Sequence, residues 1–324
     1  MSPFLNPKAL RAHKLQNTIQ TVLIMAGMGI LLTVCAMLVF GAAGLGWAAV
    51  LVGLLLVLLP RVPPELLMTM YRARRVAPGS GGQLDEIVTV LAERAKLPAR
   101  PTLYIVPSMA LNAFATGRPD HAVIAVTEGL LRKLTLREVA NVLAHEMSHI
   151  RNNDLWVMGV ADVVTRLAQA LSYVGVFLAI LNVLGALEGE QYASWTAVLL
   201  LYLAPTLSSL LQLALSRTRE FDADVEGAQL TGDPLGLASA LRRLELHSGQ
   251  FWEDLMMPVP GRRVAYPSLL RSHPPTEERV RRLVALSNQP MGDSLVVEEE
   301  PMISLVGFGP IQMRPRHRFP GVWF

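Results

Sequence analysis

The sequence predicts a mainly α-helical membrane protein with a small β-sheet and about four transmembrane helices in two hairpins. Its 324 residues are 52% hydrophobic and only 17% charged, against roughly 25% charged in ordinary soluble domains. Four long stretches without a charged side chain cause this bias, and segments with helical or strand periodicity lie between them. A large buried core fits less well, because four such stretches would leave little surface on a chain of this length.

The first hydrophobic region, Leu15–Pro60, contains no charged residue. At roughly 20 residues per crossing, its length predicts two transmembrane helices that turn within the glycine-rich stretch Gly41–Gly46. The region is too long for a secretory signal peptide and lacks a small-residue cleavage pattern, so we expect it to be retained. It holds the only cysteine of the chain, Cys35, for which we expect a small core position.

A second hairpin is predicted from the uncharged stretches Leu167–Leu187 and Gln191–Ser216, which are separated only by Glu188-Gly189-Glu190. Pro205 marks a position where the later helix can kink. The earlier stretch is just long enough to cross a bilayer, and a segment that only dips into the bilayer is the alternative.

Basic residues predict the orientation of the chain. Seven of them flank the first hairpin, whereas the turn of the second carries only acidic residues; the seven are Lys8, Arg11, Lys14, Arg61, Arg72, Arg74 and Arg75. By the positive-inside rule, both termini and the segments 61–160 and 217–324 are cytoplasmic. The two crossings between these segments return the chain to the side that it left, so both segments share one compartment.

Periodicity predicts further helices and strands outside the hairpins. Helices are expected at Gln83–Lys96, from Thr135 onward, at Pro234–Ser248 and at Pro275–Leu286; strands are expected at Pro101–Val106, Leu111–Thr116 and His121–Val126. The helix from Thr135 begins with a capping box, Thr135-Leu136-Arg137-Glu138. Its apolar residues form one stripe, made of Val139, Val142, Leu143, Met147 and Ile150.

This capped helix carries the sequence His145-Glu146-Met147-Ser148-His149. Histidines four residues apart share one helix face, which suits two ring nitrogens binding one Zn²⁺. Glu146 is rotated by roughly 100° from His145, so its carboxylate lies beside the metal, where it can take a proton from bound water. A solvated helix with two surface histidines is the alternative. The histidines flank the apolar stripe, however, which places them at the edge of a buried cleft.

A third ligand is expected after the second hairpin, because a catalytic zinc needs three protein ligands. Glu220 and Asp224 are again four residues apart. One carboxylate can bind zinc while the other holds the far ring nitrogen of a ligand histidine. A charged helix face without a metal is the alternative reading of this run. The membrane layout favours the metal site, because it brings both segments to one side of the bilayer.

Several motifs together resemble the M48 family, in particular its HtpX-type branch of bacterial membrane zinc proteases. The resemblance covers roughly residues 15–285. It rests on the histidine motif with Asn153-Asp154 and on the run from Ser216-Arg217 to Glu220 and Asp224. Three further runs contribute to it: Asn112–Gly117, Thr127–Leu131 and His273–Arg279. It implies a zincin-like (gluzincin) catalytic domain facing the cytoplasm of the inner membrane. It also implies one Zn²⁺ per chain, bound by His145, His149 and Glu220, with Glu146 as base and Asp224 holding a ligand.

The resemblance further implies proteolysis of misfolded membrane proteins as quality control. In zincin folds an edge strand above the active helix pairs with the extended substrate, and we expect Asn112, Ala113 and Phe114 there. A plain packed strand is nearly as consistent with these residues. His273 can polarise the scissile carbonyl, although a histidine that opens a helix next to prolines is more often a cap or loop residue.

The remaining features limit the class of partner. A pI near 9.2 arises partly from arginines beside the membrane, which favours a lipid bilayer over nucleic acid as the partner.

Alternatives to the proposed enzyme are a prenyl-protein protease of the Ste24 type and a membrane scaffold without activity. The expected divisions are an N-terminus (1–14), a hairpin (15–60), the first catalytic part (61–160), a second hairpin (161–216), the second catalytic part (217–290) and a tail (291–324). The sequence indicates neither an oligomeric state nor a role for the tail.

Overall fold

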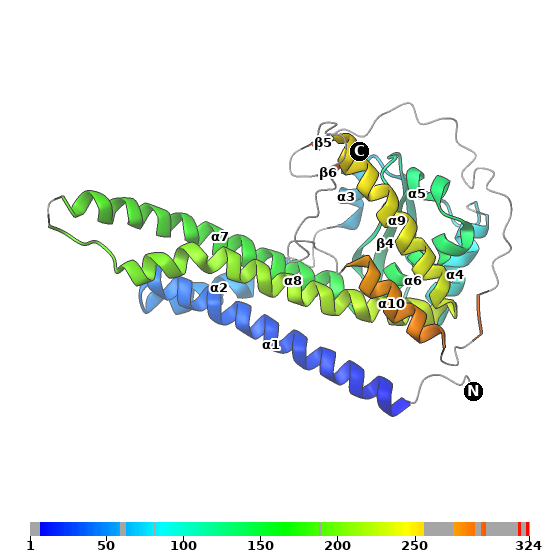
Figure 1. Ribbon diagram of the computed structural model, residues 1–324, viewed down its shortest axis with the longest axis horizontal. Helices are drawn as coiled ribbons and strands as arrows, with labels where there is room; N and C mark the ends of the chain where they lie inside the picture. The colour runs from blue at the N-terminus through cyan, green and yellow to red at the C-terminus, as the bar shows by residue number, and fades with distance from the viewer. Residues whose placement is uncertain are drawn as a thin grey trace. The chain divides into compact units, whose positions relative to one another are not determined.

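The structure is a computed structural model, and it describes residues 7–58, 63–80, 82–187, 189–255, 275–288, 293–295, 317–318 and 322–323. The chain divides into two compact units (Figure 1). One unit comprises residues 11–61 and 156–218, and the other comprises residues 1–10, 62–155 and 219–324. His273 and Glu188 lie outside the described residues.

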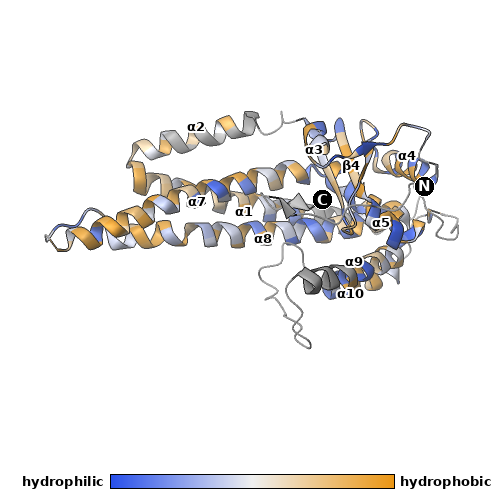
Figure 2. Cartoon of the chain, turned by 90° about the horizontal axis from the view of Figure 1, so that it is seen from above, coloured by the Kyte–Doolittle hydropathy of each residue, from blue (hydrophilic) through white to orange (hydrophobic). Residues whose placement is uncertain are grey.

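The first unit consists of long apolar helices. These are α1 (Pro7–Phe40), α2 (Ala43–Leu58) and the larger parts of α7 (Asp154–Gly185) and α8 (Trp195–Thr231). Hydrophobic residues predominate along these helices (Figure 2). Within the described residues, three helices are long and apolar enough to cross a membrane, in α1, α7 and α8. The described part of α2 has 16 residues and is shorter than these.

Small and aliphatic side chains hold the membrane helices together. Cys35 of α1 is buried against Ala168 of α7 and against Leu201 and Ala204 of α8, which confirms its expected role as a small core residue. The turn between α7 and α8 is closed by Asn182, whose Oδ1 accepts hydrogen bonds from the N–H groups of Tyr192 and Ala193, each at 2.9 Å.

The second unit contains a small mixed sheet, in the order β1 (Arg74–Arg75), β2 (Thr102–Val106), β4 (His121–Thr127), β3 (Ala113–Arg118). Strand β4 pairs in parallel with β2 and antiparallel with β3, and its residues after His121 are all buried. Strand β3 therefore lies at one edge of the described sheet. The observed strands confirm the three expected from the sequence, and β1 is an additional short one.

Helices cover both faces of this sheet. On one face, α4 (Gln83–Ala95) and α6 (Leu136–Arg151) enclose a core that includes Leu91, Ile124, Leu143 and Met147. Burying each such side chain stabilises the fold by about 1.5–3 kcal/mol. On the other face, α3 (Pro64–Met70) packs through Met68. The helix α5 (Glu128–Lys133) follows β4 directly.

Two further helices complete the unit, α9 (Pro234–Leu255) and α10 (Thr276–Ser287), which lie side by side (Figure 1). Leu237 and Leu241 of α9 pack against Val280 and Leu283 of α10, together with Ala228 near the end of α8. This packing brings α10 to the part of α8 that carries the expected third ligand. A short antiparallel pair, β5 (His317–Arg318) and β6 (Val322–Trp323), lies in the C-terminal tail.

Candidate metal centre

The helix α6 carries the two histidines and Glu146 of the site. The predicted capping box is confirmed, because the Thr135 hydroxyl accepts from the Glu138 N–H at 3.3 Å and a Glu138 carboxylate oxygen accepts from the Thr135 N–H at 2.8 Å. The apolar stripe fixes the rotation of the helix against the sheet. His145 is consequently buried and His149 half-buried, rather than both being exposed on a solvated face.

The last three turns of α8 face α6 through one stripe, formed by Glu220, Asp224, Gly227 and Thr231. Thr231 donates a hydrogen bond of 2.8 Å to Asn141 of α6. A Cβ atom on Gly227 would lie only 3.0 Å from the backbone Cα and N of His145, so the glycine allows the two helices to approach closely. The close approach brings carboxylates of α8 to the histidines of α6.

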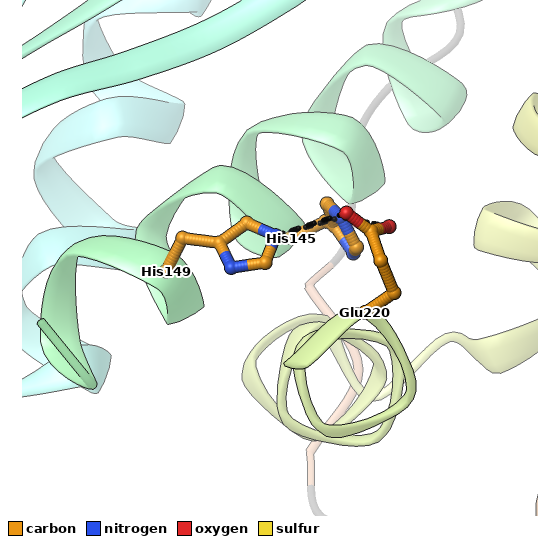
Figure 3. Close-up of side chains that lie close together, drawn as sticks. All are labelled: His145, His149 and Glu220. Carbon is orange, nitrogen blue, oxygen red and sulfur yellow. Dashed lines mark hydrogen bonds and ion pairs between the residues drawn. The ribbon is translucent and has the colours of Figure 1, made fainter. Parts of the chain in front are cut away.

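The two imidazoles and the Glu220 carboxylate converge from these two helices (Figure 3). The Nε2 atoms of His145 and His149 are 3.2 Å apart, and they lie 3.6 and 3.8 Å from the nearer Glu220 oxygens. One ligand atom from each residue can be chosen so that all three lie within 4.8 Å of one another. Two nitrogens and one carboxylate oxygen are the donor set of catalytic zinc sites with His and Glu ligands, so these residues fit a metal ion.

Each histidine turns its other ring nitrogen to an aspartate. His145 Nδ1 lies 3.1 Å from an Asp224 oxygen, and His149 Nδ1 lies 2.9 Å from an Asp154 oxygen. A proton shared with the aspartate on Nδ1 leaves the lone pair of Nε2 free for a metal. Asp224 therefore occupies the supporting place expected from the sequence.

Two arginines hold these aspartates. Arg279 of α10 donates two hydrogen bonds to Asp224, at 2.7 and 2.6 Å, and its third nitrogen lies 3.2 Å from Glu220. Arg219 donates to Asp154 at 2.8 Å. Both aspartates are nearly fully buried, and each is paired with an arginine, as buried carboxylates in proteins usually are.

The carboxylates around His145 suit an imidazole that can bind either a proton or a metal cation. Burial lowers the pKa of His145, but hydrogen bonds and charge from Asp224 and Glu220 outweigh it and raise that pKa to about 10. A metal ion therefore competes with a proton at this imidazole. Burial raises the pKa of Glu146, although the neighbouring histidines and the Ala115 N–H oppose the shift. A carboxyl with a raised pKa is a better proton acceptor near neutral pH.

The edge strand β3 lies over this helix. The backbone N–H of Ala115 donates to the Glu146 carboxylate, which ties the strand to the motif. Thr127 N–H donates to Asn112 O at 3.0 Å, so the backbone of Asn112 faces β4. Because facing alternates along an antiparallel ladder, Phe114 also faces β4, and Ala113 and Ala115 turn their backbone groups to the open edge.

The structure thus brings His145, Glu146, His149, Glu220 and Asp224 together. Asp154, Arg219, Arg279 and Gly227 were not assigned roles from the sequence, although the first three lie within motifs that carried the family resemblance. The signal that could have identified Asp154 and Arg279 was their position in the motifs that contain His149 and the run His273–Arg279.

Comparison with known proteins decides the family. Residues 78–287 match the family described as Peptidase family M48. The chain belongs to this family. It is 36% identical over 287 residues to a protease HtpX homolog of Desulfatibacillum aliphaticivorans, covering 85% of this chain and 92% of that one. A protease HtpX homolog of Acaryochloris marina is 42% identical over 238 residues, covering 69% and 79%. The protein is therefore a membrane metalloprotease with several apolar helices.

Among solved structures, the chain is similar to Ste24p of S. mikatae, with 18% identity and a TM-score of 0.49. The match covers 84% of this chain and 66% of that one. Ste24p is thus a distant structural neighbour, whereas the curated relatives with higher identity are named protease HtpX homologs.

Proposed function

We propose that the protein is a zinc-dependent endopeptidase of the cytoplasmic membrane that cleaves cytoplasmic or unfolded segments of misfolded membrane proteins. The observation that carries this proposal is the convergence of His145, His149 and Glu220 within 4.8 Å, with Glu146 beside them. These three residues are the proposed ligands, and one Zn²⁺ per chain is the proposed cofactor. The role in quality control extends the family resemblance to this chain.

The chemistry assigns a separate task to each residue. Bound zinc supplies a Lewis acid that polarises a peptide carbonyl and acidifies water. Glu146 accepts the proton of the attacking water and returns it to the leaving amine. Asp224 and Asp154 fix the tautomers of the two histidines, and Arg279 and Arg219 hold these aspartates in place.

The substrate is proposed to bind as an added strand along β3. Ala113 presents its backbone groups at the open edge, whereas Asn112 and Phe114 bond toward β4 and the N–H of Ala115 bonds to Glu146. The substrate contacts are therefore better assigned to the backbone of Ala113 than to those of its two neighbours. Strand addition requires an extended segment, which suits unfolded chains and loops. His273 is also proposed to polarise the scissile carbonyl.

The decisive experiment compares wild type with Glu146→Gln, which keeps the size of the side chain and removes the base. Zinc content, measured on the purified proteins, should stay at one per chain, while casein digestion falls by about 10²–10⁴-fold. Glu86→Gln, an exposed position on α4, is the matched control and should digest casein like wild type. Equal digestion by wild type and Glu146→Gln would refute the mechanism and favour a scaffold. Cleavage restricted to prenylated peptides would favour the Ste24-type alternative.

We also propose four crossings, with both termini and the catalytic parts (61–160 and 217–290) in the cytoplasm. The proposal rests on the basic residues that flank the first hairpin. It places Gly189 on the periplasmic side and Gly79 on the cytoplasmic side. Both glycines have φ near +80° and open space around them, so cysteines there are matched probes.

In a Cys35→Ala background, a membrane-impermeant thiol reagent applied to the periplasmic side should label Gly189→Cys and spare Gly79→Cys. Labelling of both cysteines, or of Gly79→Cys alone, would show that the orientation is wrong. Labelling of neither would show that the second hairpin does not cross the bilayer.

A further inference from the structure

The loop that leads into β3, residues 107–112, is held by a corner of the fold formed by Thr127, Glu128 and Gly129. This corner lies where β4 ends and α5 begins. None of the chemistry described above uses these three residues. Their contacts nevertheless set the position of the strand along which the substrate is proposed to bind.

The hydroxyl of Thr127 uses its full hydrogen-bonding capacity on this loop and on α5. It accepts from the N–H of Asn112 at 3.0 Å and from the N–H of Leu130 at 3.3 Å. Its single hydrogen is directed to the carbonyls of Ala110 and Asn112, at 2.6 and 2.9 Å. A hydroxyl has one donor and two acceptor sites, so no capacity is left. Thr127 is 4% exposed, so its hydroxyl is shielded from water.

The neighbours of Thr127 make the corner rigid. Gly129 donates to Ser108 O at 2.9 Å, and a Cβ atom on Gly129 would lie 2.2 Å from Met109 O, so the loop rests directly on the glycine backbone. The buried carboxylate of Glu128 lies 2.6 Å from Arg74 of β1, at the opposite edge of the sheet. The corner is thus tied to both edges of the sheet.

The N-terminal end of β3 depends on this corner more than the rest of the strand does. Residues 113–118 pair with β4 in the ladder, and Ala115 is also bonded to Glu146. Ala113 is the first residue of this ladder and turns its backbone to the open edge, and its neighbour Asn112 bonds to Thr127 through both backbone groups. Loosening the corner would therefore disturb the place of substrate pairing while leaving the proposed base in position.

We propose that Thr127 is a positioning residue for substrate binding, which holds the start of the edge strand in register for pairing with an extended polypeptide. The inference rests on the proposed binding of substrate along β3. It predicts a change in KM rather than in kcat, because loss of the strand's position weakens substrate binding more than it slows the chemical step.

The test is Thr127→Val, which keeps the shape of the side chain and removes the acceptor of the Asn112 and Leu130 N–H groups, the second of which is buried. For an unfolded peptide substrate, KM should rise about tenfold, kcat should change by less than about threefold, and zinc content should not change. Thr127→Ser keeps the hydroxyl and should restore KM. Thr89→Val, which removes a hydroxyl bonded only within α4, is the matched control and should behave like wild type.

A second variant and a second measurement complete the test. Ser108→Ala removes the acceptor of the Ala110 N–H at 3.2 Å without touching the cap of α5, and should raise KM about threefold. In Thr127→Val, amide hydrogen exchange should accelerate at residues 110–114 and stay unchanged in α6. An unchanged KM and unchanged exchange would overturn the inference, as would a joint loss of kcat and zinc. Absence of cleavage by wild type would instead refute the proposed function, and hydrogen exchange would still decide the role of Thr127.

Discussion

Replacing Gly227 by alanine should weaken metal binding without altering any ligand. The new Cβ would meet the backbone Cα and N of His145 at 3.0 Å and the carbonyl carbon of Ala144 at 3.4 Å. Backbone atoms cannot rotate away, so α8 must retreat from α6 by a few tenths of an ångström. Metal sites tolerate about 0.2 Å in their ligand distances, and Glu220 and Asp224 lie on the stripe that moves.

Two opposing terms set the size of the effect on stability. Alanine favours a helix over glycine by about 1 kcal/mol, whereas overpacking costs about 1–3 kcal/mol, so the fold should lose up to about 2 kcal/mol. The affinity for zinc should fall about tenfold, as for loss of a contact that supports a ligand. Competition with a chelator measures the affinity, and thermal unfolding measures the stability.

Gly29→Ala is the matched control, because its Cβ would meet nothing within 4 Å and the position is also helical. That variant should bind zinc like wild type. If Gly227→Ala bound zinc as tightly as Gly29→Ala, the close approach of the two helices would not position the ligands, and the reasoning would be wrong.

Three further outcomes are expected. Asp154→Asn should lower zinc affinity about 10–100-fold in chelator competition, whereas Asp162→Asn, in an exposed pair, should not. Glu220→Ala should leave two ligands and lose zinc on mild chelation, and undiminished occupancy would refute the ligand assignment. Burial raises the pKa of Asp233, but hydrogen bonds and charge from Arg137 outweigh it and depress that pKa. The ionised carboxylate therefore stabilises the fold above the unfolded-state pKa, and this contribution is lost as pH falls through the folded-state pKa. Asp233→Asn should accordingly lower the melting temperature at pH 7, and the difference from wild type should shrink as pH falls below the unfolded-state pKa of an aspartate, about 3.9; an undiminished difference at acidic pH would contradict this.

Local signals predicted the parts of the site that lie on single helices. The capping box and the apolar stripe located α6, and spacing of four residues identified both the histidine pair and the Glu220–Asp224 pair. Contacts between elements could not be read in this way. Asp154 meets His149 only because Asn153 adopts a positive φ of 55° and turns the chain between α6 and α7. Arg279 reaches Asp224 only through the packing of α10 on α9 and α8.

The lengths of the membrane helices illustrate a second limit. Absence of charge predicted a helix from Leu167, whereas α7 begins at Asp154 and includes the pair Asp162–Arg166. Similarly, α8 continues through Pro205 and beyond Ser216 to Thr231. A helix can extend past its apolar part wherever its polar side chains find partners or water, and a search for uncharged stretches misses that extension.

The order of the ligands along the chain has a consequence for biosynthesis. Glu220 follows His149 by about 70 residues, and Arg279 follows Glu220 by about 60 more. At a translation rate of 5–20 residues per second, a ribosome needs roughly 4–14 s to pass from the second histidine to the third ligand. All of α7 and most of α8 are made in that interval. If Glu220 is the third ligand, as proposed, a nascent chain carries the histidine motif before its metal site is complete, and it should be unable to cleave other proteins at the insertion site until its own membrane helices have been made.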